Sequence, residues 1–318
     1  MNHLLTRLRK ALLIWLDNKH HQSPMDGEDV RRIDLIRILP FIFLHVMCLG
    51  VLVVGVSWFA VLFALFTYLI RMFAITAFYH RYFAHRAFRT SRPVQFLFAM
   101  LGATATQRGA LWWAAHHRTH HRHSDTEHDP HTPQQGFFWS HMGWFLSRKH
   151  VHTEADSIPD LMRYPELRWL DRFDLLMPVL FATGIFLLGG WLETAAPQLG
   201  TSAGQLLIWG YFISTVVLIH VTLMINSLAH VCGRRRYATP DHSRNNWLLA
   251  LLTLGEGWHN NHHHYPGSAR QGFYWWEIDI SFYLLKLMSW LGLVSDLKPV
   301  PAAIRENRGV MRRRRNKH

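Results

Sequence analysis

Long runs without charged residues dominate the hydrophobic pattern of the chain. Residues 38–70 contain no Asp, Glu, Lys or Arg, whereas one helix that crosses a bilayer needs only about 20 residues. This run is therefore long enough for two passes with a turn between residues 50 and 57. Two further apolar runs follow later in the chain. The pattern predicts four transmembrane helices, at about 38–56, 58–79, 175–192 and 206–229.

Basic residues are distributed unevenly between the segments that flank these runs. The first predicted turn and the connection 193–205 contain no Lys or Arg, whereas residues 1–34, 80–174 and everything after His230 contain many. Because Lys and Arg accumulate on the cytoplasmic side of membrane proteins, we expect both termini and a His-rich helical cap to be cytoplasmic. The predicted fold is an all-α integral membrane protein, divided into a basic N-terminal segment (1–34), a membrane domain (35–300) and a basic tail (301–318).

Composition supports the membrane interpretation. Charged residues are 17% of the 318 residues, compared with about 25% in soluble domains. The net charge of +13 suits an anionic membrane surface or an acidic protein, and no nucleic-acid-binding motif is present. Two cysteines, Cys48 and Cys232, make neither a disulfide framework nor a metal motif.

Both ends of the chain are rich in basic residues. Leucines recur at every fourth position from Leu4 to Leu16 with basic residues between them, which fits a helix lying on a membrane surface or an ordinary solvated helix. The tail ends in the run Arg312 to Arg315, which fits contact with anionic headgroups or a solvated end without function.

The chain contains 24 histidines, and nine of them lie in four short segments that border the apolar runs. Residues at i, i+3 and i+4 share one face of a helix, whereas residues five apart converge only where a helix ends or bends. Imidazole binds iron, zinc and copper, and nine histidines exceed the four ligands of one zinc site. They suit two metals of higher coordination number. The segments are His80 with His85, His117 with His120 and His121, Asn226 with His230, and His259 with His262 and His263.

Other polar residues lie close to these segments. A metal-bound imidazole needs an acceptor for its second nitrogen, and Asp125, Asp129 and Glu256 are candidates for that role, with Glu127 also nearby. Single histidines in apolar surroundings, such as His45 and His220, are interpreted as core residues. Further histidines lie off the motif spacing and are not expected to be ligands: His116, His123, His128, His131, His141 and His264.

The segments resemble those of the membrane fatty acid desaturase family, in its delta-9 acyl-CoA and acyl-lipid branch. That branch carries one H-x-x-x-x-H and two H-x-x-H-H motifs in this order. The resemblance includes residues 255–266, with Gly-Glu-Gly-Trp before the third motif and Tyr-Pro after it, and residues 129–144 after the second. It covers roughly residues 35–299. His116 departs from the family pattern, because relatives often carry an acidic residue there.

The resemblance implies that the nine histidines bind two iron ions, which zinc could replace in a purified sample, and that Asn226 holds a metal-bound water. It further implies an acyl chain in a tunnel beside the metals. The activity would be introduction of a cis double bond, at the delta-9 position, with O2 and two electrons. An external donor such as ferredoxin or a b-type cytochrome would supply the electrons, and acyl-CoA and acyl-lipid substrates both remain open.

Two other functions fit part of the pattern. A membrane di-iron hydroxylase or ketolase would share the histidine motifs but insert oxygen. A His-rich metal transport or storage protein would need its site near the middle of the bilayer, whereas these histidines are predicted at helix ends and in the cap.

Overall fold

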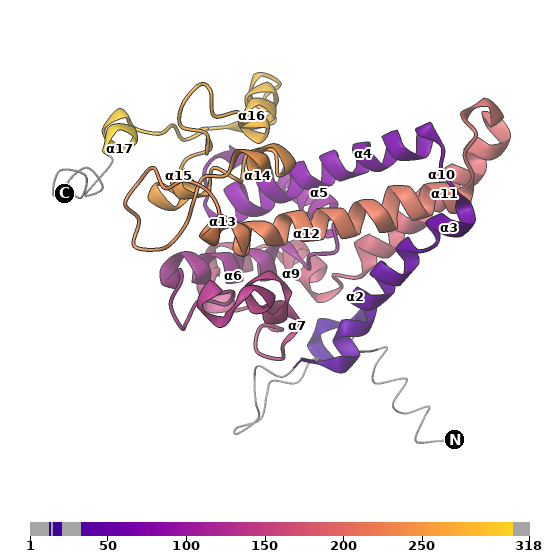
Figure 1. Cartoon of the computed structure of the whole chain (residues 1–318), viewed down its shortest axis with the longest axis horizontal. Helices are drawn as coiled ribbons and strands as arrows, with labels where there is room; N and C mark the ends of the chain where they lie inside the picture. Colours follow the sequence, from indigo (N-terminus) through magenta and orange to yellow (C-terminus); the bar gives the residue numbers. More distant parts are fainter. Residues whose placement is uncertain (1–12, 14, 21–32, 308–318) are drawn as a thin grey trace.

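The computed structural model describes residues 13, 15–20 and 33–307, and most of them are helical (Figure 1). The leucine pattern at the N-terminus and the run Arg312 to Arg315 lie largely or wholly outside the described residues. Within the described residues, the short helix η1 (Asn18–His20) precedes the first long helix.

Three helices of the described part are long and apolar enough to cross a membrane: Trp58–Ala84, Leu176–Ala195 and Ala203–Val231. They correspond to the second, third and fourth predicted spans and extend a few residues beyond the predicted ends. The first predicted span is a shorter apolar helix, Ile38–Val54, with a turn at Leu49 and Gly50. The structure thus provides three candidate spans, and a fourth remains a prediction.

These long segments are built from several elements. The first is α2 (Leu35–Cys48) followed by α3 (Val51–Val54). The second is α4 (Trp58–Phe73), which continues as the π-helix η2 (Ala74–Ala84). The third is α10 (Leu176–Ala195), in which Pro178 occupies the first turn, as expected. The fourth joins α11 (Ala203–Leu206), the π-helix η7 (Leu207–Ile213), α12 (Ser214–Asn226) and α13 (Leu228–Val231).

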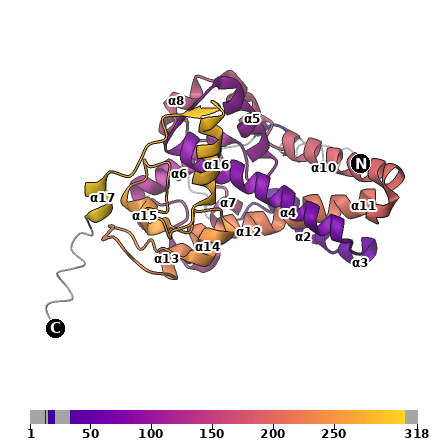
Figure 2. The same cartoon turned by 90° about the horizontal axis from the view of Figure 1, so that it is seen from above.

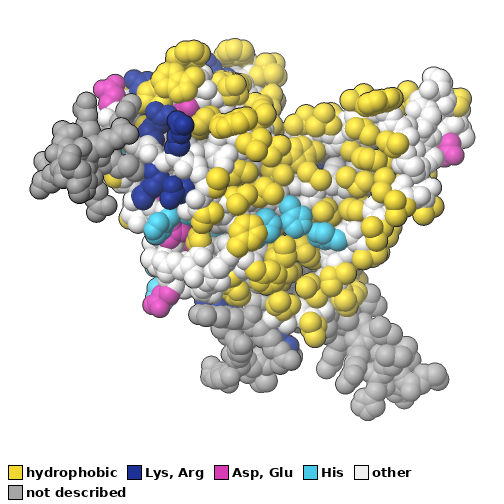
Figure 3. Space-filling view, in the orientation of Figure 1, with side chains coloured by type: hydrophobic (Ala, Val, Ile, Leu, Met, Phe, Trp, Pro, Cys, Tyr) yellow, Lys and Arg dark blue, Asp and Glu magenta, His cyan; other side chains and the backbone are white. Residues whose placement is uncertain are grey.

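Large apolar side chains cover the outside of the long helices (Figure 3). At the tip that joins α3 to α4, Leu52, Val53 and Trp58 are 82%, 89% and 84% exposed. Water-soluble proteins seldom expose apolar surface this extensively. Together with the three long apolar helices, this surface fits association with a membrane.

A buried cation, Arg71, lies inside the second long helix. Its guanidinium donates hydrogen bonds to the carbonyls of Thr67 and Thr104 and to the hydroxyls of Ser214 and Thr215. Charged groups within membrane helices are rare and need such partners. Arg71 therefore links α12 to α4 through buried hydrogen bonds.

Short helices gather at one end of the long ones (Figures 1 and 2). Phe78 of η2 stacks on Phe98 of α5 at 3.7 Å between ring centroids, and a large apolar core joins η2, α5, α6 and α9. Two short strands pair antiparallel, with Arg89 opposite Ser295. In chain order the elements are β1 (Arg89–Thr90), α5 (Arg92–Ala103), α6 (Ala110–His123), η3 (Pro133–Gln135), η4 (Trp139–Gly143), α7 (Trp144–Leu146), η5 (Ala155–Ser157), α8 (Pro159–Met162), α9 (Pro165–Arg172), η6 (Pro197–Leu199), α14 (Trp247–Leu252), α15 (His259–His264), α16 (Ile280–Trp290), β2 (Val294–Ser295) and α17 (Ala302–Glu306).

Candidate metal centre

The π-helix η2 explains the five-residue spacing of the first histidine motif. The amide of His85 donates to the carbonyl of His80 at 3.2 Å, which is the i to i+5 bond that defines a π-helix. This wider turn brings the rings of His80 and His85 to 4.9 Å between centroids. The convergence that the sequence required at a helix end or bend is therefore produced by a change of helix type.

The helices α6 and α15 are held in place by polar groups close to their histidines. Asp171 accepts a hydrogen bond from the amide of Trp112 in the first turn of α6 (2.9 Å). In α15, the Asn245 side chain accepts from the amides of Asn260 and Asn261 at 2.9 and 3.1 Å. The two asparagines inside the third motif thus anchor the helix, which leaves the histidines free to project from it.

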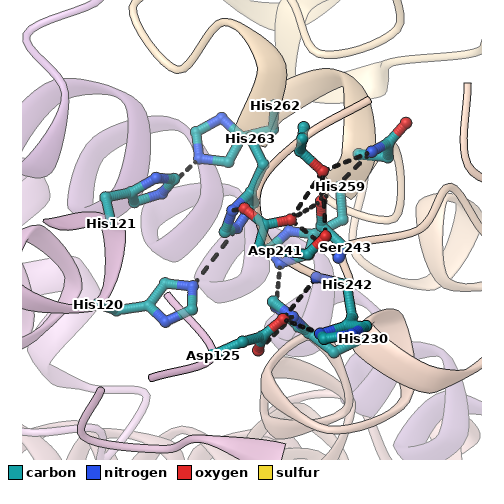
Figure 4. A network of polar contacts seen from close by, with 12 residues as sticks. His120, His121, Asp125, His230, Asp241, His242, Ser243, His259, His262 and His263 are labelled. Atoms are coloured by element: carbon teal, nitrogen blue, oxygen red, sulfur yellow. Dashed lines mark hydrogen bonds and ion pairs between the residues drawn. The ribbon is translucent and has the colours of Figure 1, made fainter. Parts of the chain in front are cut away.

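The nine predicted ligands come together as two groups, and Figure 4 shows the four members of one of them, His120, His230, His259 and His263, with His121 and His262 of the other. In each group, one ligating atom per histidine lies within 4.8 Å of all the others. The Nε2 atoms of neighbouring members are 2.9 Å apart for His85 and His117 and 3.0 Å apart for His230 and His259. The five-His group is His80, His85, His117, His121 and His262; the four-His group is His120, His230, His259 and His263.

Each H-x-x-H-H motif contributes to both groups, in opposite senses. In α6, the i and i+4 residues His117 and His121 enter the five-His group, and the i+3 residue His120 enters the four-His group. In α15 the assignment is reversed, since the i+3 residue His262 enters the five-His group. The three histidines of each motif, which were expected on one helix face, are thus divided between the two groups.

Carboxylates contact the outward nitrogens of four of these histidines. Asp129 lies 3.0 Å from Nδ1 of His120, Asp125 lies 3.0 Å from Nδ1 of His230, and Glu256 contacts Nδ1 of His80. A carboxylate on Nδ1 fixes the ring tautomer, because Nδ1 then carries the proton and Nε2 offers its lone pair. Glu127 does not take part, since it is 83% exposed and contacts the surface residue His128.

Asp241 is a fourth carboxylate of this kind, and the sequence did not single it out. Its Oδ2 lies 2.7 Å from Nδ1 of His263 (Figure 4), and its Oδ1 accepts from the backbone amide of Ser243 at 3.0 Å and from the hydroxyl of Thr239 at 2.9 Å. Burial opposes ionisation, but the His263 contact outweighs it and lowers the pKa of Asp241 below its ordinary value. Asp241 lies in the connection after α13, where its neighbours carry no metal motif.

We expect Asp241→Asn to weaken metal binding by the four-His group by about 10–100-fold, the usual cost of losing such a partner. Retention of metal during challenge with a graded series of chelators would measure the change. Asp296→Asn is the matched control, because that carboxylate is 61% exposed and pairs only with Arg89 among the ion pairs of the described chain. Equal metal retention in the two variants would contradict this role for Asp241.

Electrostatics keep three imidazoles of the five-His group neutral. Burial, together with the proximity of the other rings, holds the pKa of His117, His121 and His262 well below the usual value. A neutral imidazole is the form that binds metal. The Nε2 lone pairs, together with the carboxylates at Nδ1, thus make both groups suitable for binding cations.

The donor geometry fits metal ions. Two nitrogens bound at right angles to a metal about 2.1 Å away are about 3.0 Å apart. The Nε2 atom of His262 lies 3.0 Å from Nε2 of His80 and 2.9 Å from Nε2 of His121. The Nε2 atoms of His120 and His263 are 3.4 Å apart. The five-His group therefore fits a cation of coordination number above four, and the four-His group fits a cation of coordination number four or more.

A buried ion-pair network contacts the five-His group through Glu256, the carboxylate beside His80. The guanidinium of Arg81 lies 3.0 Å from Glu256 and 2.9 Å from Asp279, and all three side chains are buried. Gln271 donates to Glu256 at 2.7 Å. Gly255 has φ +132° and a side chain there would collide with Asp279 and Arg81. The glycine before Glu256 thus allows the network to close beside His80.

An apolar cavity of about 220 Å³ reaches the five-His group. Its walls include Phe41 and Leu44 of α2 and Leu223 of α12, and His117 and Asn226 also line it. No side-chain hydrogen bond of Asn226 is found within the described residues. Asn226 ends α12 and His230 belongs to α13, with a turn at Ser227 between them. The cavity gives an elongated apolar ligand access to the metal centre.

Histidines off the motif spacing lie outside both groups. His45, His220 and His141 form a hydrogen-bonded row, with 2.9 Å between Nε2 of His45 and Nε2 of His220 and 2.9 Å between Nδ1 of His220 and Nε2 of His141. His264 contacts the carbonyl of Ile304. His131 packs its ring on that of His120 at 4.2 Å and does not enter the four-His group.

Comparison with known proteins identifies relatives over most of the chain. A 36% identical relative, the "Acyl-CoA C20 Delta5-desaturase" of Anemone leveillei, aligns over 86% of this chain and 85% of its own length. The "Delta-9 acyl-lipid desaturase 1" of Arabidopsis thaliana is 35% identical over 88% of both chains. The "sn-2 palmitoyl-lipid 9-desaturase" of Nostoc sp. (strain 36) is 37% identical over 70% of this chain and 75% of its own.

The family model described as fatty acid desaturase matches residues 56–289. This stretch contains all nine clustered histidines and their four carboxylate partners. The chain belongs to the fatty acid desaturase family.

Proposed function

We propose that the chain is a fatty acyl desaturase that introduces a cis double bond, at the delta-9 position, into a saturated acyl chain. One observation carries the proposal: of two convergent histidine groups, the five-His group contributes His117 to the wall of an apolar cavity that Asn226 also lines. Family membership supports the reaction class, and relatives named as 9-desaturases support the position.

The five-His and four-His groups would each hold one iron ion, with Asn226 reaching the second through a water molecule. Bound iron supplies the oxidising power, drawn from O2 and two electrons, that removes hydrogens from two unactivated methylenes. The histidines fix the two cations, and the outer carboxylates fix the histidine tautomers. Zinc would occupy the same imidazoles in a purified sample, since both metals accept this ligand.

The residues of the cavity would position the acyl chain and exclude water. Phe41, Leu44 and Leu223 present only apolar side chains to it, so a saturated chain enters without leaving a polar group unpaired. A fixed distance between the head group and His117 would select which carbon pair is presented to the centre. The polar residues Asn18, Arg108 and Asp174 also line the cavity and could mark the head-group end.

We further propose a multi-pass membrane protein with four spans, in which the short helices form a cytoplasmic cap. The division of basic residues between the segments supports this orientation, and Lys and Arg lie on the side of the molecule that carries α15–α17 (Figure 3). A basic surface suits an acidic electron donor such as ferredoxin or a b-type cytochrome.

Expression in an auxotroph for unsaturated fatty acids tests the proposal. We expect growth without supplement and a new cis-monounsaturated acyl chain, with its double bond placed by mass spectrometry. Pulse-labelling separates the two substrate classes: label pre-incorporated in membrane lipid becomes unsaturated only if acyl-lipid is the substrate. A hydroxylated or keto product would instead favour the hydroxylase or ketolase alternative.

A further inference from the structure

A third set of metal-ligating side chains lies outside the two histidine groups. His116 belongs to α6, whereas His150 and Glu154 belong to the connection between α7 and α8. One ligating atom from each lies within 4.8 Å of the others. None of the three belongs to the five-His or the four-His group, so this cluster is unexplained by the proposed desaturase centre.

His116 is fixed in the tautomer that binds a metal. Its Nδ1 donates to the carbonyl of Trp112 at 2.9 Å, so Nε2 carries the lone pair. The residue is 2% exposed, and Nε2 is buried with no hydrogen-bond partner among the described residues. A buried nitrogen without a partner is unusual in a native protein and calls for an explanation.

His150 has two buried ring nitrogens without a hydrogen-bond partner among the described residues. The residue is 4% exposed. The ring lies edge-on to that of His116, with 5.6 Å between centroids. Its backbone carbonyl accepts from Nε1 of Trp112 at 2.8 Å. Trp112 therefore holds both histidines, one through its carbonyl and the other through its indole.

Glu154 completes the set with a negative charge. Its Oε2 accepts from the hydroxyl of Thr119 on α6 at 2.8 Å, which orients the carboxylate over the same helix. The residue is exposed, so the cluster opens to solvent on this side and a cation could enter. Two imidazoles and one carboxylate, with water as the fourth ligand, form a common donor set for zinc.

We propose that His116, His150 and Glu154 bind a third divalent metal ion of the zinc type. The ion would link the connection after α7 to α6. It would satisfy the unpartnered Nε2 of His116 and one of the two unpartnered ring nitrogens of His150, and leave one ligand position for water. Because it uses none of the residues assigned to the other two groups, the proposal stands whether or not the chain is a desaturase.

Metal counting tests it on the full-length protein. The chain would be produced with iron and zinc in the medium, purified in detergent, dialysed against metal-free buffer and analysed by plasma mass spectrometry. We expect the sum of iron and zinc to be three ions per chain. Glu154→Gln and His150→Ala should each lower the sum to two, and the two retained ions show that the variant is folded.

His128→Ala is the matched control, because His128 is a surface histidine with a side chain 70% exposed and belongs to no cluster. It should retain three ions. A sum of two metal ions per chain in the unmodified protein would overturn the proposal. Retention of three ions by both single variants, Glu154→Gln and His150→Ala, would also overturn it. Failure of fatty acid desaturation with a sum of three would contradict the proposed function alone.

Discussion

Replacing His262 by alanine is expected to abolish desaturation and to remove the metal of the five-His group. His262 contacts three other members of its group: its ring centroid lies 4.4 Å from that of His80, 4.6 Å from that of His85 and 4.7 Å from that of His121. Loss of an outer partner already costs about 10–100-fold. Loss of a ligand itself should lower the metal affinity by more than this factor.

The auxotroph assay and the metal content of the purified variant measure these two effects separately. The matched control is His264→Ala, a histidine of the same helix that lies outside both groups and stacks on Tyr237 at 4.0 Å. It should retain growth and both metals of the desaturase centre. Growth of the His262→Ala strain at the unmodified rate would show that this group is dispensable.

Arg81→Met is expected to destabilise the fold by about 3–5 kcal/mol, the cost of removing one partner from a buried ion pair. The substitution leaves the carboxylates of Glu256 and Asp279 facing each other without a cation, and both are buried. Glu256 would also lose a group that orients it toward His80. We therefore expect weaker metal retention in the five-His group as well.

Thermal unfolding in detergent would report the loss as a lower midpoint. Arg89→Met removes the same charge from an ion pair whose arginine is 80% exposed, where the expected cost is about 0–1 kcal/mol. The comparison cancels the general effect of changing the net charge. Equal shifts in the two variants would mean that the buried network contributes no more than a surface pair.

The long helices were predictable because apolar content alone reveals them. What the pattern could not show is how the helices are interrupted. At Gly50 a side chain would lie 2.6 Å from Ile208 of η7, so the turn that shortens the first predicted span adjoins a close contact with a distant segment. The helices η2 and η7 look like ordinary apolar helix in the sequence, since a π-turn leaves no compositional signature.

The histidines of the site were predictable from their spacing, but their division between two groups was not. Spacing shows that His117, His120 and His121 share a helix face; only the position of α15 shows which partner each one meets. Asp241 escaped notice because its contact with His263 joins the connection after α13 to the helix α15, which are apart in the sequence. Asp125, Asp129 and Glu256 were named because they lie close to the motifs in sequence.

The four outer carboxylates are unequally divided between the two groups. Asp125, Asp129 and Asp241 contact members of the four-His group, whereas Glu256 alone contacts the five-His group and shares its charge with Arg81. Nearby negative charge stabilises the more highly charged state of a cation. The two groups, which both offer only imidazole nitrogens, therefore differ in the negative charge around them, and the four-His group is the better suited of the two to a cation of higher charge.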